Sequence, residues 1–289
     1  MNDLPIEYLI RLLDDPDDRV FQSVSQKIRE IGPSMIPDLE RALQVATHKL
    51  LHERFEDLIQ ILRFEELQSD LKKWTGTPRQ DLLTGITIMT RCQFPEMAAE
   101  TMASLLKPVK NEIWLELNDQ LTALERIRVI NSLLFRNGRY IIDDQHPESP
   151  GNNFVNRMLE TGKGNEFSMT LLYAWLCQEL GLPVYAIGMP DYPILAYLDI
   201  PVMPENAVNP AVFDALFFIN PSNDGSVHSQ KDIMDYLMRK SVPLEPVFYM
   251  PKPNVDFIRM CLEHLAADYA SFNNKKRAAQ VSLLASLCK

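Results

Sequence analysis

The chain has 289 residues, of which 46% are hydrophobic and 24% are charged, and its formal net charge is −10 at pH 7. These fractions are typical of folded globular proteins and exclude a chain that is disordered throughout. The excess of acidic residues disfavours a function on nucleic acid or on an anionic membrane surface, because both need basic patches.

The first residues, MNDLPIEYLI, do not form a secretory signal, and no stretch of about 18 apolar residues occurs. The four cysteines are too widely spaced for a metal-binding pair or a secreted disulfide framework. We therefore expect a cytoplasmic protein that has no membrane segment and needs no cofactor.

Apolar residues recur at helical spacing near the start of the chain, on both sides of Asp15–Pro16. Proline suits a helix start, and Asp17 or Asp18 can cap the helix that follows. Gly32–Pro33 is predicted to end that helix. The two helices resemble one HEAT-type repeat, but no second clear copy follows, so we expect a helical subdomain rather than a solenoid.

The remaining elements are predicted from periodicity and from turn residues. A segment between residues 136 and 166 is rich in Pro, Gly and Asn and is predicted to be irregular, which in a compact domain often indicates function. Three short β-branched or aromatic runs, VYAIGM, ILAYLD and DALFFIN, predict strands. Helices are predicted over residues 48–74, 79–92, 96–110, 119–135, 167–180, 231–239, 256–272 and 276–287.

Helices, then a small sheet, then helices predict an α+β fold that is mostly helical, with a small, mostly antiparallel sheet. Within it, NNFVNRMLETGKGNEF leads into a helix that ends at GLP, and a strand turn and FFINPSNDG follow. In this order and spacing the segment from Asn152 to Tyr236 resembles the SirB-type branch of the transglutaminase-like superfamily. The resemblance implies a papain-like core at residues 116–245, between HEAT-like helices at residues 1–115 and a tetratricopeptide-like helical hairpin at residues 246–289.

Enzymes of that superfamily use a Cys–His–Asp triad, in which a thiolate, a base and an orienting carboxylate act together. The resemblance places the three triad positions at Glu166, Tyr192 and Asn220. None of these residues can supply the thiolate, the imidazole or the charged orienter. Ser168 matches a serine at the start of the family's helix, and a helix-capping role is favoured because no histidine aligns beside it.

Cys177 lies further along the same predicted helix. Helical spacing places it on the flank of a buried stripe formed by Met169, Leu172, Leu176 and Leu180. It is therefore interpreted as a structural cysteine rather than a nucleophile.

Two further groups of polar residues are candidates for chemistry. If the resemblance holds, Glu166 and Asp191 could face each other across the groove that contains the triad positions and act as an acid–base pair. Asp143, Asp144 and His146 could bind a metal ion, but one loop without a partner motif more often carries solvated side chains.

Three hypotheses of function follow. The first is a non-catalytic transglutaminase-like protein that acts as a binding or scaffold module, with a protein or peptide in its degenerate groove. The second is a hydrolase or amide-transfer enzyme that uses Ser168 or a carboxylate. The third is a helical-repeat adaptor whose N-terminal helices bind a partner. No nucleic-acid or membrane partner is expected, and the sequence leaves the oligomeric state open.

Overall fold

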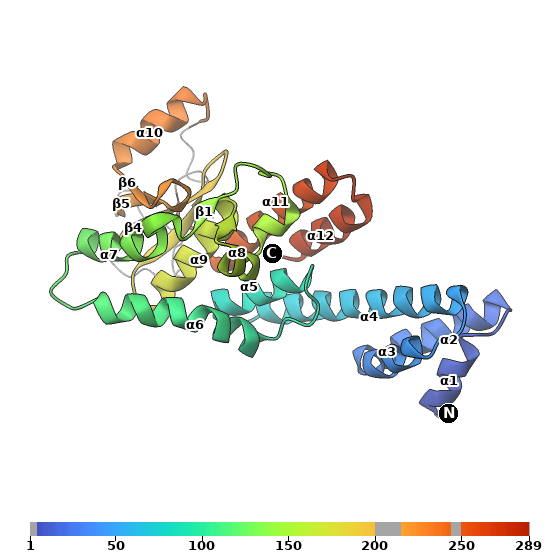
Figure 1. Cartoon of the computed structure of the whole chain (residues 1–289). Coiled ribbons are helices and arrows are strands. Elements are labelled where there is room, and N and C mark those ends of the chain that lie inside the picture. The colour runs from blue at the N-terminus through green and yellow to red at the C-terminus, as the bar shows by residue number, and fades with distance from the viewer. Residues whose placement is uncertain (1–4, 200–214, 244–249, 289) are drawn as a thin grey trace. The chain divides into compact units, whose positions relative to one another are not determined.

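The computed structural model describes residues 5–199, 215–243 and 250–288 (Figure 1). The chain divides into two compact units, residues 1–73 and residues 74–289. The three-part division at residues 115 and 245 stays a prediction, and its second boundary lies outside the described residues. In the described part of the chain, no helix is long and apolar enough to cross a membrane.

The first unit is helical. It contains α1 (Ile6–Leu12), α2 (Asp18–Ile31), α3 (Ile36–Gln44) and most of α4 (Lys49–Thr75). The predicted break between α1 and α2 is confirmed, because the Asp17 carboxylate caps α2 by accepting a hydrogen bond from the Arg19 N–H at 2.8 Å. Helix α2 ends at Gly32, whose φ of +91° few other residues adopt. Helix α3 lies within the predicted helical subdomain, although the sequence analysis gave it no bounds of its own.

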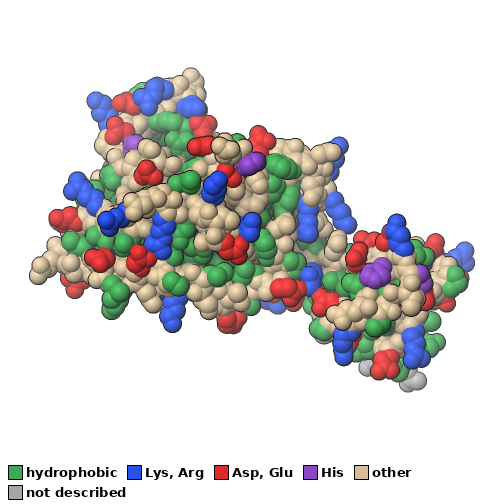
Figure 2. Space-filling view, in the orientation of Figure 1, with side chains coloured by type: hydrophobic (Ala, Val, Ile, Leu, Met, Phe, Trp, Pro, Cys, Tyr) green, Lys and Arg blue, Asp and Glu red, His purple; other side chains and the backbone are tan. Residues whose placement is uncertain are grey.

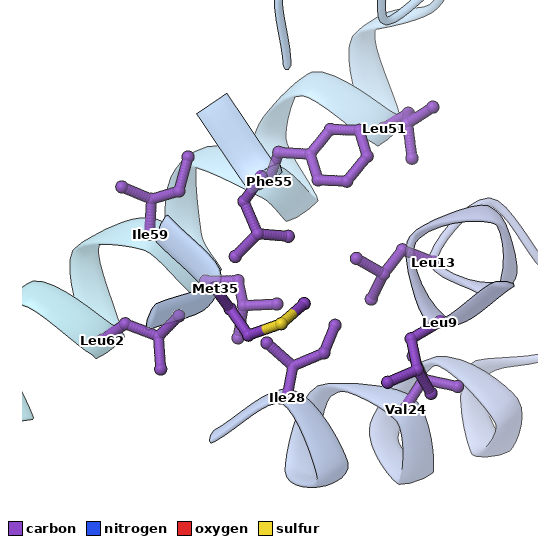
Figure 3. Packing of buried hydrophobic residues seen from close by; sticks show 11 residues of the cluster. Leu9, Leu13, Val24, Ile28, Met35, Leu51, Phe55, Ile59 and Leu62 are labelled. Atoms are coloured by element: carbon purple, nitrogen blue, oxygen red, sulfur yellow. The ribbon is translucent and has the colours of Figure 1, made fainter. Parts of the chain in front are cut away.

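One hydrophobic core holds the first unit together. Buried side chains from α1, α2, the 3₁₀ turn Pro33–Met35, α3 and α4 point toward one another, among them Leu13, Ile28 and Phe55 (Figure 3). Arg54 of α4 is 9% exposed, and its guanidinium donates hydrogen bonds to the carbonyls of Leu13 and Asp15, both at 2.9 Å. These bonds satisfy carbonyls after the end of α1 and fix the α1–α2 turn on α4.

The second unit contains a four-stranded antiparallel sheet surrounded by helices. The strands are β3 (Val184–Gly188), β4 (Pro193–Leu198), β5 (Ala215–Asn220) and β6 (Ser226–His228), in that order across the sheet. Ala186 pairs with Leu195, and Ala196 pairs with Phe218, so the three predicted strands adjoin one another. Asp214, the first residue of the third predicted run, lies outside the described residues.

The helices of the second unit follow the predictions, except for α8, which was not predicted. They are α5 (Leu82–Arg91), α6 (Ala99–Glu116), α7 (Ala123–Phe135), α8 (Val155–Thr161), α9 (Glu166–Glu179), α10 (Gln230–Arg239), α11 (Asn254–Ser271) and α12 (Lys275–Leu287). Helix α9 packs against β3 and β4, while α11 and α12 form the predicted hairpin (Figure 1). The mostly helical α+β class is therefore confirmed.

Two predictions for this unit are wrong. The segment predicted to be irregular contains α8 and a short parallel pair, β1 (Ile141–Ile142) with β2 (Lys163–Gly164). Helix α9 is not amphipathic either, because every residue from Phe167 to Cys177 is buried. The spacing of apolar residues did not predict the buried face there, because α5, α8 and the sheet all contact α9 and cover this stretch from solvent.

Candidate functional site

A pocket of about 630 Å³ lies at the N-terminal end of α9. Its wall combines the start of α9, strand β1, the residue before β4 and the turn after β5. Glu166, Tyr192 and Asn220, the three triad positions that the resemblance assigns, all line it. The other lining residues are Phe135, Tyr140, Ile141, Ile142, Asp144, Met169, Pro221, Ser222, Asn223 and Asp224.

Glu166 reaches the pocket because Asn165 starts α9 directly before it. The side-chain carbonyl of Asn165 accepts hydrogen bonds from the N–H groups of Phe167 at 3.1 Å and Ser168 at 3.0 Å. This N-cap makes Glu166 the first residue of the helix. The Glu166 side chain is half-buried, and its carboxylate has no hydrogen-bond or ion-pair partner among the described residues.

Ser168 completes the same capping box and does not line the pocket. Its hydroxyl accepts a hydrogen bond from the Asn165 N–H at 3.0 Å and donates to the Asn165 carbonyl at 3.2 Å. The residue is fully buried, and Met158 covers the hydroxyl, with 3.7 Å between Oγ and sulfur. A substrate therefore has no path to this oxygen in the described structure.

Tyr192 and Asp191 form the turn between β3 and β4, but only Tyr192 lines the pocket. Asp191 contacts α10 and its C-cap residue instead: the Lys240 ammonium lies 2.6 Å from its carboxylate, and the Tyr236 hydroxyl donates to the same oxygen. The hydrogen bonds from Lys240 and Tyr236 lower the pKa of Asp191. The structure thus brings Glu166 together with Tyr192, and it places Asp191 in a contact that holds the turn on α10.

Asn220 ends β5 and is 9% exposed. Its side-chain carbonyl accepts hydrogen bonds from the N–H and the hydroxyl of Ser222, at 3.1 and 2.6 Å. A backbone N–H can donate only to an acceptor. The side-chain atom of Asn220 that faces the Ser222 N–H is therefore the amide oxygen and not the nitrogen. The Nδ2 group is not one of the buried side-chain atoms that lack a hydrogen-bond partner in the described residues.

The turn after Asn220 is held by two residues that the sequence analysis missed. Asn131 of α7 donates a hydrogen bond to the Gly225 carbonyl at 2.7 Å, and the Tyr173 hydroxyl donates to the Asn131 side-chain carbonyl, also at 2.7 Å. Gly225 has a φ of +67°, in the region that favours glycine. Asp224–Gly225 is a recognisable turn signal, but no local pattern points to Asn131.

The remaining candidates lie elsewhere or are differently arranged. Cys177 is fully buried, burial raises the pKa of its thiol, and it does not line the pocket. His146 Nδ1 lies 3.7 Å from the carboxylate of Asp143, whereas Asp144 lines the pocket. In the part of the chain that the structure describes, no three His, Cys, Asp or Glu residues are grouped so that they could hold a metal ion.

The site can now be compared with known families. A family model described as transglutaminase-like superfamily matches residues 100–263, a region that includes every residue of the pocket and the whole described sheet. Comparisons with curated proteins and with solved structures gave no match. Since the match spans more than half of the chain, the protein belongs to the transglutaminase-like superfamily.

Proposed function

We propose that this chain is a cytoplasmic, SirB-type member of the superfamily that has lost its catalytic triad and acts as a binding module. The observation that supports the proposal most strongly is the pocket itself. Glu166, Tyr192 and Asn220 come from three separate segments, yet all line one pocket of about 630 Å³. That volume is within the range of small-ligand sites and suits a side chain with adjoining backbone.

The residues of the pocket do not provide the chemistry of acyl transfer. None of the described residues that line it is Cys or His. The carboxylate of Glu166 is a poor nucleophile towards amides, and neither the phenol of Tyr192 nor the amide of Asn220 can replace an imidazole base near neutral pH. A recognition pocket without a reaction is therefore the function that these residues fit best.

We propose a protein segment or peptide as the ligand. In this proposal residues 1–115 keep HEAT-like character and residues 246–289 keep tetratricopeptide-like character, flanking the core. The pocket is open to solvent at exposed residues such as Asp144 and Asn223, so a chain that passes over the surface can insert one side chain.

A library of short random-sequence peptides tests the proposal. The full-length protein, immobilised, should retain a subset of the library, and Asn223→Trp should lose it because the indole fills the mouth of the pocket. Asn111→Trp is the matched control, since Asn111 is equally classed as exposed but lies on α6 away from the pocket. Equal retention by both variants would contradict binding at this pocket.

The competing hypothesis is an enzyme, a hydrolase or amide-transfer relative that uses Ser168 or a carboxylate. It is tested by hydrolysis of a peptide and ester library by the wild type, Glu166→Gln and Ser168→Ala. The binding proposal expects no turnover above that of buffer. Turnover that disappears in either variant would establish the enzyme instead.

The helical adaptor is favoured by one observation in the first unit. A groove of about 650 Å³ runs between α1 and α2, with Leu12, Val20 and Ile31 among its lining residues. Ser23→Trp should block it, and Gln22→Trp is its control, because both residues are exposed and only Ser23 lines the groove. A partner lost by Ser23→Trp but kept by Asn223→Trp would favour the adaptor over the pocket.

A further inference from the structure

The groove between α1 and α2 exposes apolar surface that the core of the first unit leaves uncovered. Its volume is about 650 Å³, and Leu12, Val20 and Ile31 are among its lining residues. Ile31 is 41% exposed, and Tyr8, which lies one helical turn before Leu12 on α1, is 49% exposed. Apolar side chains that share one solvent-facing surface favour contact with another protein surface.

The groove follows α2 along almost its whole length. The lining residues on α2 are Arg19, Val20, Ser23, Val24, Gln26, Lys27, Glu30 and Ile31. They recur every three or four positions, so they form one stripe from the second residue of the helix to its last. At a rise of about 1.5 Å per residue, the stripe is roughly 18 Å long. A surface of this shape fits a second helix that lies along α2.

The two ends of the stripe carry opposite charges. At the first end, the guanidinium of Arg19 forms no hydrogen bond or ion pair in the part of the chain that the structure describes. At the other end, the carboxylate of Glu30 accepts hydrogen bonds from Lys27 at 3.3 Å and from Gln26 at 3.5 Å. Both of these bonds lie on the surface of the same helix, and exposed pairs of this kind contribute little to stability.

The two aspartates directly before Arg19 have partners of their own. The carboxylate of Asp18 lies 3.2 Å from the guanidinium of Arg54, and the carboxylate of Asp17 caps the helix by accepting from a backbone N–H. The side chain of Arg19 is therefore available to a carboxylate of a second molecule.

The dipole of α2 is unfavourable for both charges. A cation is destabilised at the start of a helix and an anion at its end, where the partial charges of the backbone have the same sign. Arg19 is the second residue of α2, and Glu30 is the next to last. A second helix that runs antiparallel alongside α2 would bring its negative end to Arg19 and its positive end to Glu30, so it would offset both effects.

We propose that this groove is the contact between two copies of the chain, whose α2 helices pack antiparallel about a two-fold axis. The middle of the stripe is Ser25, and helices that cross there place Arg19 of each copy beside Glu30 of the other. The two-fold axis forms this ion pair twice and covers Ile31 in both copies, so the surface is complementary to itself. The proposal does not depend on the function of the pocket, because every residue that it uses lies in the first unit.

Sedimentation velocity of the full-length protein tests the proposal over concentrations from about 1 μM to about 1 mM. The wild type should change from monomer to dimer as the concentration rises. The contact consists of two short helices from each copy, so the dimer should be weak and should form at the upper concentrations. A protein that stays monomeric at every concentration would overturn the proposal and leave the groove to a different partner.

Exchange of the two charges then tests the antiparallel arrangement. Arg19→Glu and Glu30→Arg should each raise the dissociation constant by roughly tenfold, because the two-fold axis repeats each like-charge contact. The double variant Arg19→Glu/Glu30→Arg restores opposite charges, so its dissociation constant should return towards that of the wild type. A double variant as weak as the single ones would contradict the pairing of Arg19 with Glu30.

Lys49→Glu is the matched control for the net charge. It changes the charge by the same two units on α4, at a side chain that is 90% exposed and does not line the groove. It should leave the dissociation constant unchanged. If Lys49→Glu weakens the dimer as much as Arg19→Glu does, the effect comes from the charge of the whole protein and the proposed contact is wrong.

Discussion

Glu166 occupies a position where negative charge is favourable. The first N–H groups of an α-helix have no intrahelical acceptor, and the helix dipole adds partial positive charge at that end. The same electrostatics that stabilise a thiolate at a helix start stabilise a carboxylate there. Glutamate at this position is therefore electrostatically favourable at the head of α9. Cys177, further along the same helix, is fully buried, and burial disfavours its thiolate.

The buried thiol gives a pH-dependent stability. An unfolded cysteine releases its proton near pH 8.5, whereas burial holds the pKa of Cys177 well above that value. Above about pH 8.5 the unfolded chain loses protons that the folded chain keeps, so the free energy of unfolding falls as pH rises, by up to roughly 1.4 kcal/mol per pH unit for each such thiol. Cys177→Ala should make this fall shallower in urea unfolding between about pH 8 and about pH 10.

The comparison between the wild type and Cys177→Ala depends on how steeply the free energy of unfolding falls with pH, and not on its absolute value. The alanine leaves a small cavity, which lowers the free energy of unfolding by the same amount at every pH. Cys92 remains in both proteins, and since burial raises its pKa to about 12, part of the slope persists. Identical slopes for the wild type and Cys177→Ala would show that Cys177 titrates normally in the folded chain.

At the scale of elements, the pocket depends on two turns that helices hold in place. The turn between β3 and β4 is held by the contact of Asp191 with Tyr236 on α10 and with Lys240 directly after that helix. The turn after β5 is held by Asn131 on α7. Each turn is short and irregular, so its side chains point into the pocket only because a neighbouring helix fixes the backbone.

A substitution at Gly225 tests whether Asn131 holds the turn after β5. A Cβ atom there would lie 2.0 Å from the side-chain oxygen of Asn131, on a backbone with a φ of +67°. Gly225→Ala should therefore both strain the backbone and displace Asn131 from its hydrogen bonds. We expect a loss of roughly 2–3 kcal/mol in the free energy of unfolding, measured by urea denaturation.

Gly181 supplies the matched control. Its φ is +69°, but a Cβ atom there meets nothing within 4 Å. Gly181→Ala should cost only the backbone strain, roughly 1 kcal/mol. If both substitutions cost the same, the Asn131 contact does not hold the turn.

At the scale of the whole molecule, each compact unit has a core of its own. The core of the first unit is formed entirely by residues between Leu9 and Leu62 (Figure 3). The second unit has the sheet, α9 and the α11–α12 hairpin, all within residues 74–289. Acidic and basic side chains are interspersed over the visible face (Figure 2), so the net charge of −10 does not form one continuous acidic surface there.

Separate cores predict separate responses to core substitutions. Ile28 and Ile258 are both fully buried, one in each unit. Ile28→Ala should lower stability by roughly 2–5 kcal/mol and speed amide hydrogen exchange in α1 to α3, with little change in α9 and the sheet. Ile258→Ala should do the reverse. Uniformly faster exchange in either variant would mean that the two units unfold as one.

The sequence by itself determined most of the helices and three of the strands. The spacing of apolar residues, the helix caps and the turn residues depend on neighbours within a few positions of the chain, so a short stretch of sequence is enough to predict them. Membership of the superfamily was also visible, because its motifs form a contiguous segment of the chain.

Only the tertiary structure decided how these segments meet. It brought Glu166, Tyr192 and Asn220 to one pocket, enclosed α9 on every face, and set Asn131 beneath the turn at Gly225. It also showed that the carboxylates of Asp144, Glu166 and Asp224 line the same pocket. None of this has a local signature, because contacts between distant segments arise from close packing of whole elements, and packing depends on all of them at once.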